Sequence, residues 1–254
     1  AKFFNSFREL STNPESMAKR LAVKESADLL TRDFSRVSQQ LKDVRKDSNS
    51  SIAIVINDIN SITEEIAALN SQIQKVEIGG GFANDERDRR DLLVKKLGEL
   101  TDIKWAEGDD RTITVSLGGN NAILIAGSEA KVLEAVPTPA KGSKVEGDYD
   151  IIYHQHEYAE PLVITELVKG GKLGGLIEVR DGEVQEFQNN IDMMAYEIAN
   201  RVNDVHAQGY NAYNQTGVTF FNTVDSLEGA AEKMRINATV LGDVGNIVSG
   251  MDPN

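Results

Sequence analysis

The chain has 254 residues, enough for one large domain or two modest ones. Its net charge of −13 disfavours binding to nucleic-acid phosphates or to an anionic membrane surface. The absence of cysteine excludes disulfides, thiolate metal sites and cysteine nucleophiles, and no apolar run approaches the roughly 20 residues that span a bilayer.

A long helix is predicted in the N-terminal third. Asn13, Pro14 and Glu15 form a helix start signal: a capping side chain, a proline suited to the first turn, and a negative charge. Triple glycine at 79–81 ends the helix. A break at 47–51 (DSNSS) is the alternative, because these residues favour caps and turns. Between these points apolar residues alternate in steps of four and three, a coiled-coil-like seam of about 70 Å: Leu30, Phe34, Val37, Leu41, Val44, Val55, Ile59, Ile62, Ile66, Leu69, Ile73 and Val76.

The segment NDERDRRD (84–91) is the densest concentration of charge. It predicts a helix start, with Asn84 or Asp85 as the cap and acid-first pairs of Asp85 with Arg89 and of Glu86 with Arg90. Asp85, Asp88 and Asp91 lie three apart, which is the argument for a metal site. Interleaved arginines would repel a divalent cation, so the segment is interpreted as a structural clamp.

Residues 103–168 are predicted to form a small β-rich module. RTITVSL (111–117) alternates, GGNN (118–121) is a turn, and AILIAG (122–127) is a second strand, which together predict a hairpin. Further strands are expected within 131–136, 148–155 and 161–168, with a loop at 137–144. The expected division is therefore a discontinuous helical core, 1–102 with 169–254, and an inserted β-rich module, 103–168.

Two short motifs were weighed as sites. His154 and His156 lie on one face of a strand and could begin a zinc site with Glu157 and Glu160, but spacing places no third ligand, so an exposed strand is favoured. GGKLGG (170–175) lacks the residues of a phosphate loop and predicts a tight turn. No G-x-S-x-G motif is present. No catalytic residue, metal or cofactor is predicted, and the chain is not expected to be an enzyme.

A second helix is predicted after this turn, and His206 falls at its end. Because a single apolar stripe cannot stay buried alone, we expect this helix to pack against the first one. The predicted fold class is α+β: a long-helix antiparallel bundle, coiled-coil-like, with an inserted small β-rich module. The stripe repeats the spacing of the first: Val184, Phe187, Ile191, Met194, Ile198, Val202 and Val205.

Five blocks resemble the FlgK family, flagellar hook-associated protein 1, and occur in that family's order: 3–16 (FFNSFRELSTNPES), 84–100 (NDERDRRDLLVKKLGEL), 170–181 (GGKLGGLIEVRD), 199–210 (ANRVNDVHAQGY) and 216–221 (TGVTFF). The charged segment is similar to the family's N-D-L-x-D-Q-R-D block, with Glu86 and Arg89 replacing Leu and Gln. The matching positions are the residues predicted for the structural clamp: Asn84, Asp85, Asp88, Arg90 and Asp91.

The resemblance implies a structural subunit of the bacterial flagellum that self-assembles at the hook–filament junction. It implies four partners: other copies of the chain, the hook protein, hook-associated protein 3 and an export chaperone. The expected location is extracellular, in the flagellum, after export without a cleaved signal peptide. The chain is expected to be a fragment that lacks the terminal polymerisation segments and is monomeric alone.

Two alternatives remain at this stage. A sibling axial protein, hook-associated protein 3 or a flagellin, shares long helices but fits blocks 170–181 and 199–210 less well. A metal-dependent hydrolase is the alternative from a different class, and it would use Asp85, Asp88, Asp91, His154 and His156.

Overall fold

The computed structural model describes residues 2–118, 122–137, 147–155 and 159–252. These residues form two compact units: unit 1 comprises Ala1–Asp43 with Val184–Asn254, and unit 2 comprises Val44–Glu183. The predicted division, 1–102 with 169–254 and 103–168, followed secondary structure and differs from this one. Packing places the second half of the long helix in the same unit as the strands, because their apolar side chains share one core.

Unit 1 contains helix α1 (Lys2–Ser11), the first part of α2 (Met17–Ile78) and helix α5 (Val184–Gln208). Two short helices, α6 (Ala230–Lys233) and α7 (Ala238–Gly242), and the 3₁₀ turn η3 (Val244–Asn246) follow in the C-terminal segment. Its core is aromatic at one point, where the ring of Phe3 lies 5.6 Å from that of Phe220 and 5.7 Å from that of Phe221. The block TGVTFF thus ends in two fully buried phenylalanines.

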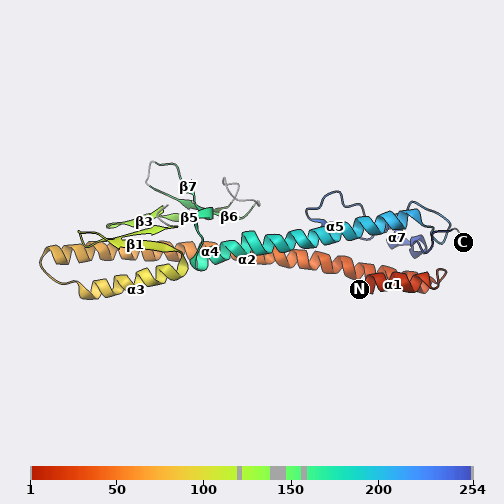
Figure 1. The fold of residues 1–254 in the computed structure, drawn as a ribbon, viewed down its shortest axis with the longest axis horizontal. Helices are drawn as coiled ribbons and strands as arrows, with labels where there is room; N and C mark the ends of the chain where they lie inside the picture. The colour runs from red at the N-terminus through yellow and green to blue at the C-terminus, as the bar shows by residue number, and fades with distance from the viewer. Residues whose placement is uncertain (1, 119–121, 138–146, 156–158, 253–254) are drawn as a thin grey trace. The chain divides into compact units, whose positions relative to one another are not determined.

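Unit 2 contains the rest of α2, helix α3 (Asn84–Leu100), two antiparallel sheets and helix α4 (Gly171–Glu178) (Figure 1). The first sheet has the order β1 (Ile103–Glu107), β2 (Ile113–Leu117), β3 (Ala122–Ala126), β4 (Glu129–Ala130). The second has the order β5 (Leu133–Pro137), β6 (Tyr149–Tyr153), β7 (Leu162–Val163). A 3₁₀ turn, η1 (Thr165–Leu167), precedes α4, and a π-helical turn, η2 (Val179–Glu183), follows it.

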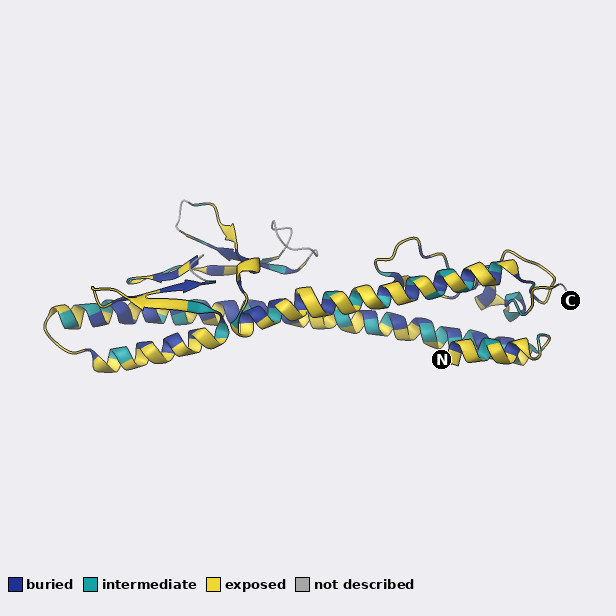
Figure 2. Cartoon of the chain, viewed as in Figure 1, coloured by how far each residue is buried: buried dark blue, intermediate teal, exposed yellow. Residues whose placement is uncertain are grey.

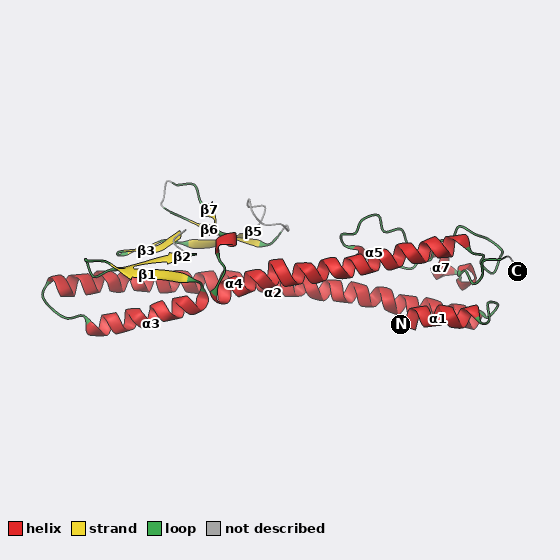
Figure 3. Cartoon of the chain, in the orientation of Figure 1, coloured by secondary structure: helices red, strands yellow, loops and turns green. Residues whose placement is uncertain are grey.

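The predicted α+β class is confirmed, with a long helix and a small antiparallel β module (Figure 3). The hairpin of β2 and β3 forms as predicted, although the turn residues 119–121 lie outside the described residues. Most of the loop expected at 137–144 also lies outside the described residues. No helix among the described segments is both long and apolar enough to cross a membrane.

Helix α2 runs without interruption for 62 residues, so the break considered at 47–51 does not occur. The serines of this stretch stay helical by bonding backward: Ser48 Oγ donates to the Val44 carbonyl at 2.9 Å and Ser50 Oγ to the Lys46 carbonyl at 3.1 Å. The helix starts later than predicted. Ser16 takes the capping position, where its Oγ accepts from the Lys19 N–H at 3.4 Å, while Pro14 lies in the preceding turn.

Half of the twelve predicted seam positions of α2 are buried and four are partly buried, whereas Val44 and Val76 are exposed. The stripe predicted for α5 behaves differently (Figure 2). Phe187, Met194 and Val205 are more than half exposed, and of the seven stripe residues only Val184 is buried. The stripe therefore only partly faces the core: Ile191, Ile198 and Val202 pack against the hydrophobic cluster from partly buried positions. The fully buried positions of α5 also include small and polar residues: Asp192, Ala195, Ala199, Asn203 and His206.

The two predicted helices do pack together within unit 1. Val23 and Ala27 of α2 share a hydrophobic cluster with Ala195 and Ala199 of α5. Only part of the predicted stripe is buried because α5 also uses its buried side to bind backbone groups of the C-terminal segment.

Candidate functional site

Helix α2 holds the strands of unit 2 through two buried asparagines, Asn49 and Asn70, and a partly buried one, Asn60. The Asn60 amide donates to the Leu133 carbonyl at 2.8 Å and accepts from the N–H of the same residue at 3.0 Å. Asn70 pairs in the same way with Ile113, at 2.9 and 3.1 Å. Each side chain thus satisfies both backbone groups of one strand residue, which is what burial of strand ends requires.

Asn70 extends this pattern further. Its Nδ2 also donates to the Gly127 carbonyl at 2.7 Å, beside β3, so one side chain joins two segments of the first sheet. Asn49 serves the second sheet, since its Oδ1 accepts from the Tyr149 N–H of β6 at 3.1 Å. Residues 49, 60 and 70 are spaced by about three helical turns, which brings them to one side of α2. The sequence analysis did not predict a role for Asn49, Asn60 or Asn70. The signal that could have indicated one was an amide side chain within a largely apolar stretch of the helix.

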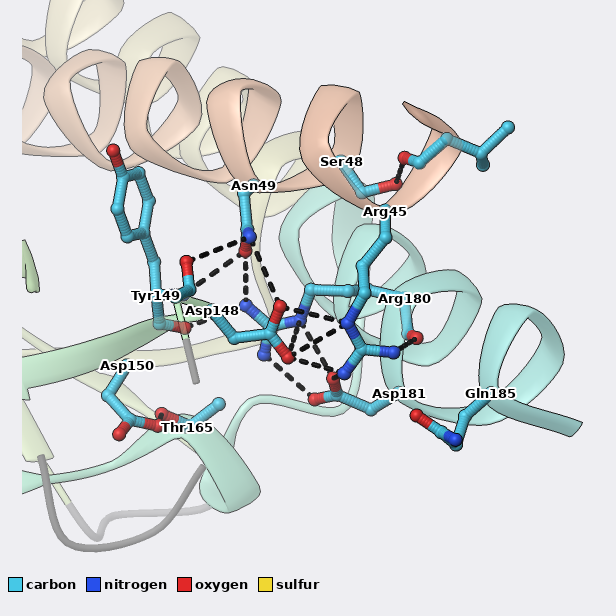
Figure 4. A network of polar contacts seen from close by, with 12 residues as sticks. Arg45, Ser48, Asn49, Asp148, Tyr149, Asp150, Thr165, Arg180, Asp181 and Gln185 are labelled. Carbon is cyan, nitrogen blue, oxygen red and sulfur yellow. Dashed lines mark hydrogen bonds and ion pairs between the residues drawn. The ribbon is translucent and has the colours of Figure 1, made fainter. Parts of the chain in front are cut away.

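A cluster of two arginines and two aspartates lies beside Asn49 (Figure 4). Arg45 of α2 donates through Nε to Asp148 at 2.9 Å and through Nη1 to the Arg180 carbonyl at 3.1 Å. The guanidinium of Arg180 donates to both carboxylate oxygens of Asp181 at 2.8 Å. A third carboxylate–guanidinium contact joins Arg45 to Asp181 at 3.6 Å.

Burial makes this cluster interdependent. The side chains of Arg180 and Asp148 are 1% and 3% exposed, and Arg180 also donates to Asn49 at 2.9 Å and to the Tyr149 carbonyl at 2.7 Å. A charge removed from water is tolerated only when it is paired and hydrogen-bonded, so loss of one member leaves an uncompensated charge behind. The cluster therefore ties α2, the start of β6 and the π turn η2 into one arrangement.

The charged segment of α3 makes its contacts through arginines. Arg87 donates to both oxygens of Glu77 at 2.6 and 2.8 Å and to Glu107 at 2.8 Å. Hydrogen bonding from Arg87 lowers the pKa of Glu77. Arg90 is 2% exposed and donates to the Arg111 carbonyl at 3.0 Å. These bonds link α3 to the end of α2 and to the first sheet.

Of the five residues predicted for the clamp, Arg90 alone contacts another element. Asn84, Asp85, Asp88 and Asp91 are exposed, and for these four described residues there is no side-chain hydrogen bond or ion pair. The cap is Ala83, whose backbone precedes the first helical residue, so neither Asn84 nor Asp85 caps. The predicted four-residue pairs are replaced by longer-range ones. Arg89, for example, binds Glu65 of α2 at 2.7 Å instead of Asp85.

The glycine-rich segment predicted as a tight turn, 170–175, forms the start of α4 from Gly171 onward, and a carboxylate of the protein itself lies at this helix start. Asp102 Oδ1 accepts from the Lys169 N–H at 3.3 Å and from the Gly170 N–H at 3.2 Å, at the start of α4. A helix N-terminus attracts anions, and here Asp102 supplies the negative charge. Gly171 has φ +66°, and a Cβ there would lie 2.5 Å from the Thr101 nitrogen, so the turn requires glycine.

The histidine motif is only partly described. His154 Nε2 lies 3.1 Å from Glu134 of the neighbouring strand, on the surface, whereas His156 and Glu157 lie outside the described residues. Asp85, Asp88 and Asp91 lie on α3, a different element. Within the described part of the chain, no three carboxylates or imidazoles are grouped so that they could hold a metal ion.

In unit 1, buried polar side chains hold the irregular C-terminal segment. Asn203 of α5 donates to the Phe221 carbonyl at 3.2 Å and accepts from its N–H at 2.8 Å, as the asparagines of α2 do with strands. Asp192 accepts from the N–H groups of Gly229 at 3.0 Å and Ala231 at 2.9 Å. Short helices and turns are thereby fixed against α5 by directional bonds in addition to the apolar packing of the shared cluster.

His206 and Arg20 complete these contacts. His206 Nδ1 lies 2.7 Å from the Val218 carbonyl, and its Nε2 accepts from the Val248 N–H at 2.9 Å, so the neutral ring with a proton on Nδ1 satisfies both neighbours. Burial lowers the pKa of His206. Arg20 is buried and donates to the Pro14 carbonyl at 2.9 Å and to the Ile247 carbonyl. His206 and Arg20 thus both hold backbone groups of the C-terminal segment.

Comparison with known proteins agrees with this architecture. Residues 1–221 match the family "Flagellar hook-associated protein FlgK helical domain". Flagellar hook-associated protein 1 of Salmonella typhimurium is 31% identical over 223 residues, which are 87% of this chain and 39% of that protein. The Escherichia coli K12 protein of the same name is 29% identical over 221 residues, 86% of this chain and 40% of the relative.

The fold is shared with a solved structure, that of the flagellar hook junction protein FlgK from Burkholderia pseudomallei. The TM-score is 0.77 at 24% identity, covering 87% of this chain and 39% of that one. The chain thus spans about two fifths of the length of these relatives. The match over residues 1–221 places the chain in the FlgK family of flagellar hook-associated proteins.

Proposed function

We propose that this chain is part of a structural subunit at the junction between the hook and the filament of a bacterial flagellum. The observation that carries the proposal is the family match along residues 1–221, together with relatives named flagellar hook-associated protein 1. The fold supports it, because the same helical and β arrangement occurs in a flagellar hook junction protein.

The architecture suits a mechanical role. Helix α2 is continuous over 62 residues, about 93 Å, and a hydrogen-bonded helix resists stretching and bending along its axis. Buried asparagines and ion pairs attach the β module and α3 to it at several points, so a force on the strands passes to the helix through directional bonds. The polar side chains of these asparagines and ion pairs bind backbone and one another, and this supports a role without catalysis.

The proposed partners follow from this role. They are other copies of the chain within the junction, the hook protein, hook-associated protein 3 and an export chaperone. The proposed location is extracellular, in the flagellum, after export through the flagellar secretion apparatus without cleavage of a signal peptide. We expect the chain as given to be monomeric by itself.

Electron microscopy of a strain in which the gene is deleted tests the junction role. We expect hooks of normal length without attached filaments, and restored filaments when the intact gene is supplied on a plasmid. Normal filaments on the deletion strain would overturn the proposal. Metal analysis of the purified protein tests the hydrolase alternative separately: tightly bound metal in stoichiometric amount would favour it over a purely structural role.

A further inference from the structure

Residues 247–250 of unit 1, here named the strap, lie against the chain that leaves α5. Two backbone bonds join the strap to Tyr210. The Tyr210 N–H donates to the Gly250 carbonyl at 2.9 Å, and the Ser249 N–H donates to the Tyr210 carbonyl at 3.3 Å. A Cβ at Gly209 would lie 2.7 Å from the Gly250 oxygen, so the strap approaches this glycine more closely than any other residue would permit.

His206 fastens the strap to α5 itself. Its Nε2 accepts from the Val248 N–H at 2.9 Å, while its Nδ1 lies 2.7 Å from the Val218 carbonyl, which fits a neutral ring with its proton on Nδ1. The side chain is 3% exposed and its ring meets that of Phe220 edge to face, with 5.3 Å between the ring centres. A second proton on the ring would set an Nε2–H donor against the Val248 N–H, and two donors cannot bond. The contact therefore exists only while His206 is neutral.

Arg20 of α2 binds the same strap and opposes a charge on His206. Its guanidinium donates to the Ile247 carbonyl and to Ser249 Oγ, the latter at 2.7 Å. Arg20 is 1% exposed, and its described hydrogen-bond acceptors are carbonyl and hydroxyl oxygens, not carboxylates. Burial lowers the pKa of His206 below its ordinary 6.5; the bond to the Val218 carbonyl opposes this effect, and the charge of Arg20 adds to it.

The segments around His206 supply no buried negative charge to balance a second proton. Residues 214–224 and 244–251 contain no titratable side chain. Tyr213 interacts with the charge of Arg20, and its hydroxyl donates to Asp243 at 2.7 Å in an exposed bond. The charged residues of α1 and of the last turns of α5 are exposed: Lys2, Arg8, Glu9, Arg201 and Asp204. Within these segments, a protonated His206 would face one buried cation and no buried anion.

We propose that His206 is a pH-sensitive latch, in which addition of a proton to the ring detaches the strap from α5. The neutral ring keeps the strap bonded, whereas the charged ring repels both the Val248 N–H and the Arg20 guanidinium. Val248 lies between the two strap residues that Arg20 binds, so loss of its bond loosens the Arg20 contacts as well. The release is local, because Ile247 is the only strap residue in the buried cluster of unit 1. The latch goes beyond the proposed junction role and does not depend on it.

Hydrogen exchange of the whole chain, followed by nuclear magnetic resonance at pH 7 and pH 5, tests the latch. Each rate is divided by the intrinsic rate at that pH, so that only protection is compared. A detached ring with the ordinary pKa of 6.5 is protonated about 30 to 1 at pH 5, so protection of the Val248 and Ser249 amides should fall by about 10- to 30-fold. The amides of Ala195 and Ala199, in the middle of α5, should change by about twofold or less.

The variant His206→Gln separates the proton from the hydrogen bonds. A glutamine amide can donate to the Val218 carbonyl and accept from the Val248 N–H, but it does not titrate, so protection of the strap should change by about twofold or less. The matched control is His154→Gln, which removes a surface histidine of unit 2 and should retain the fall seen in the parent. No fall in the parent, or an equal fall in His206→Gln, would overturn the latch.

Two further measurements keep the test decisive if His206→Gln does not fold. In Gly209→Ala the added Cβ would lie 2.3 Å from Val248 Cγ1, so the strap should be poorly protected already at pH 7 and should not respond to pH. A response as large as that of the parent would count against the latch. In the parent, the ring of His206 should titrate at the pH where protection of the Val248 amide is lost, and two separate midpoints would refute the coupling.

Discussion

The replacement Asn70→Ala tests how much the buried asparagines contribute to stability. Asn70 is fully buried and makes four hydrogen bonds: two with the backbone of Ile113, one with the Gly127 carbonyl and one, at 3.3 Å, with Arg90. At about 1 kcal/mol net for each bond the loss is about 4 kcal/mol. The better helix propensity of alanine offsets about 0.6 kcal/mol, which leaves about 3 kcal/mol of destabilisation.

Urea unfolding followed by tryptophan fluorescence measures this change in unit 2 alone, because the chain has one tryptophan, Trp105 on β1. With a slope of about 2 kcal/mol per molar urea, the midpoint should fall by about 1.5 M. The control is Asn57→Ala, the same replacement at an exposed site of α2, where we expect a change below about 0.5 kcal/mol. If the two variants have midpoints within 0.3 M of each other, the side-chain bonds do not hold the sheet.

Three further predictions concern other parts of the chain. Phe187→Ser should lower the unfolding free energy by about 1 kcal/mol or less, because the ring is 55% exposed. Ala199→Leu, in a fully buried site, should lower it by about 1–3 kcal/mol. Calorimetry that ranks the two variants in the opposite order would mean that Phe187 faces the core as the sequence pattern predicts. Because burial lowers the pKa of His206 below its ordinary 6.5, the unfolded chain binds the proton more readily, so the stabilisation is complete above pH 6.5 and is lost as the pH falls through the folded pKa. The melting temperature between pH 7 and 5 should therefore fall more steeply for the parent than for His206→Gln, and equal slopes would contradict this. Gly171→Ala should lower the unfolding free energy by about 3 kcal/mol, because Gly171 has φ +66° and an added Cβ would meet the backbone at the end of α3. Gly175→Ala should stabilise α4 by about 0.5–1 kcal/mol, because an added Cβ would meet no atom within 4 Å. Similar melting temperatures for the two variants would contradict the requirement for glycine at position 171.

The chain belongs to a family in which this piece is less than half of the whole relative. The exposed side of α5, with Phe187, Met194 and Val205, is notable because a helix that kept its apolar stripe for its own core would have buried them. Single apolar residues on the surface are usual in folded proteins.

The sequence alone determined the class of fold, the long helix and the hairpin of the β module. These features depend on local periodicity: alternating steps of three and four produce one apolar face on a helix, and alternation by two produces one on a strand. The tight turn predicted at 170–175 is helical from residue 171 onward, although Gly171 has the positive φ that favours glycine. The family resemblance rests on the order of five sequence blocks, which hydrophobic periodicity does not reveal.

Only the tertiary structure decided which polar side chains matter. Asp85, Asp88 and Asp91 formed the most conspicuous pattern, yet they point to solvent, whereas Asn60, Asn70 and the Arg45 cluster carry the contacts. A side chain whose partner lies 43 or 103 residues away in the chain leaves no periodic pattern in the sequence around it. The side of α5 that is buried, and the division between units at Asp43 and Glu183, were likewise set by partners distant in the chain, since burial is a property of what packs against a residue and not of the residue alone.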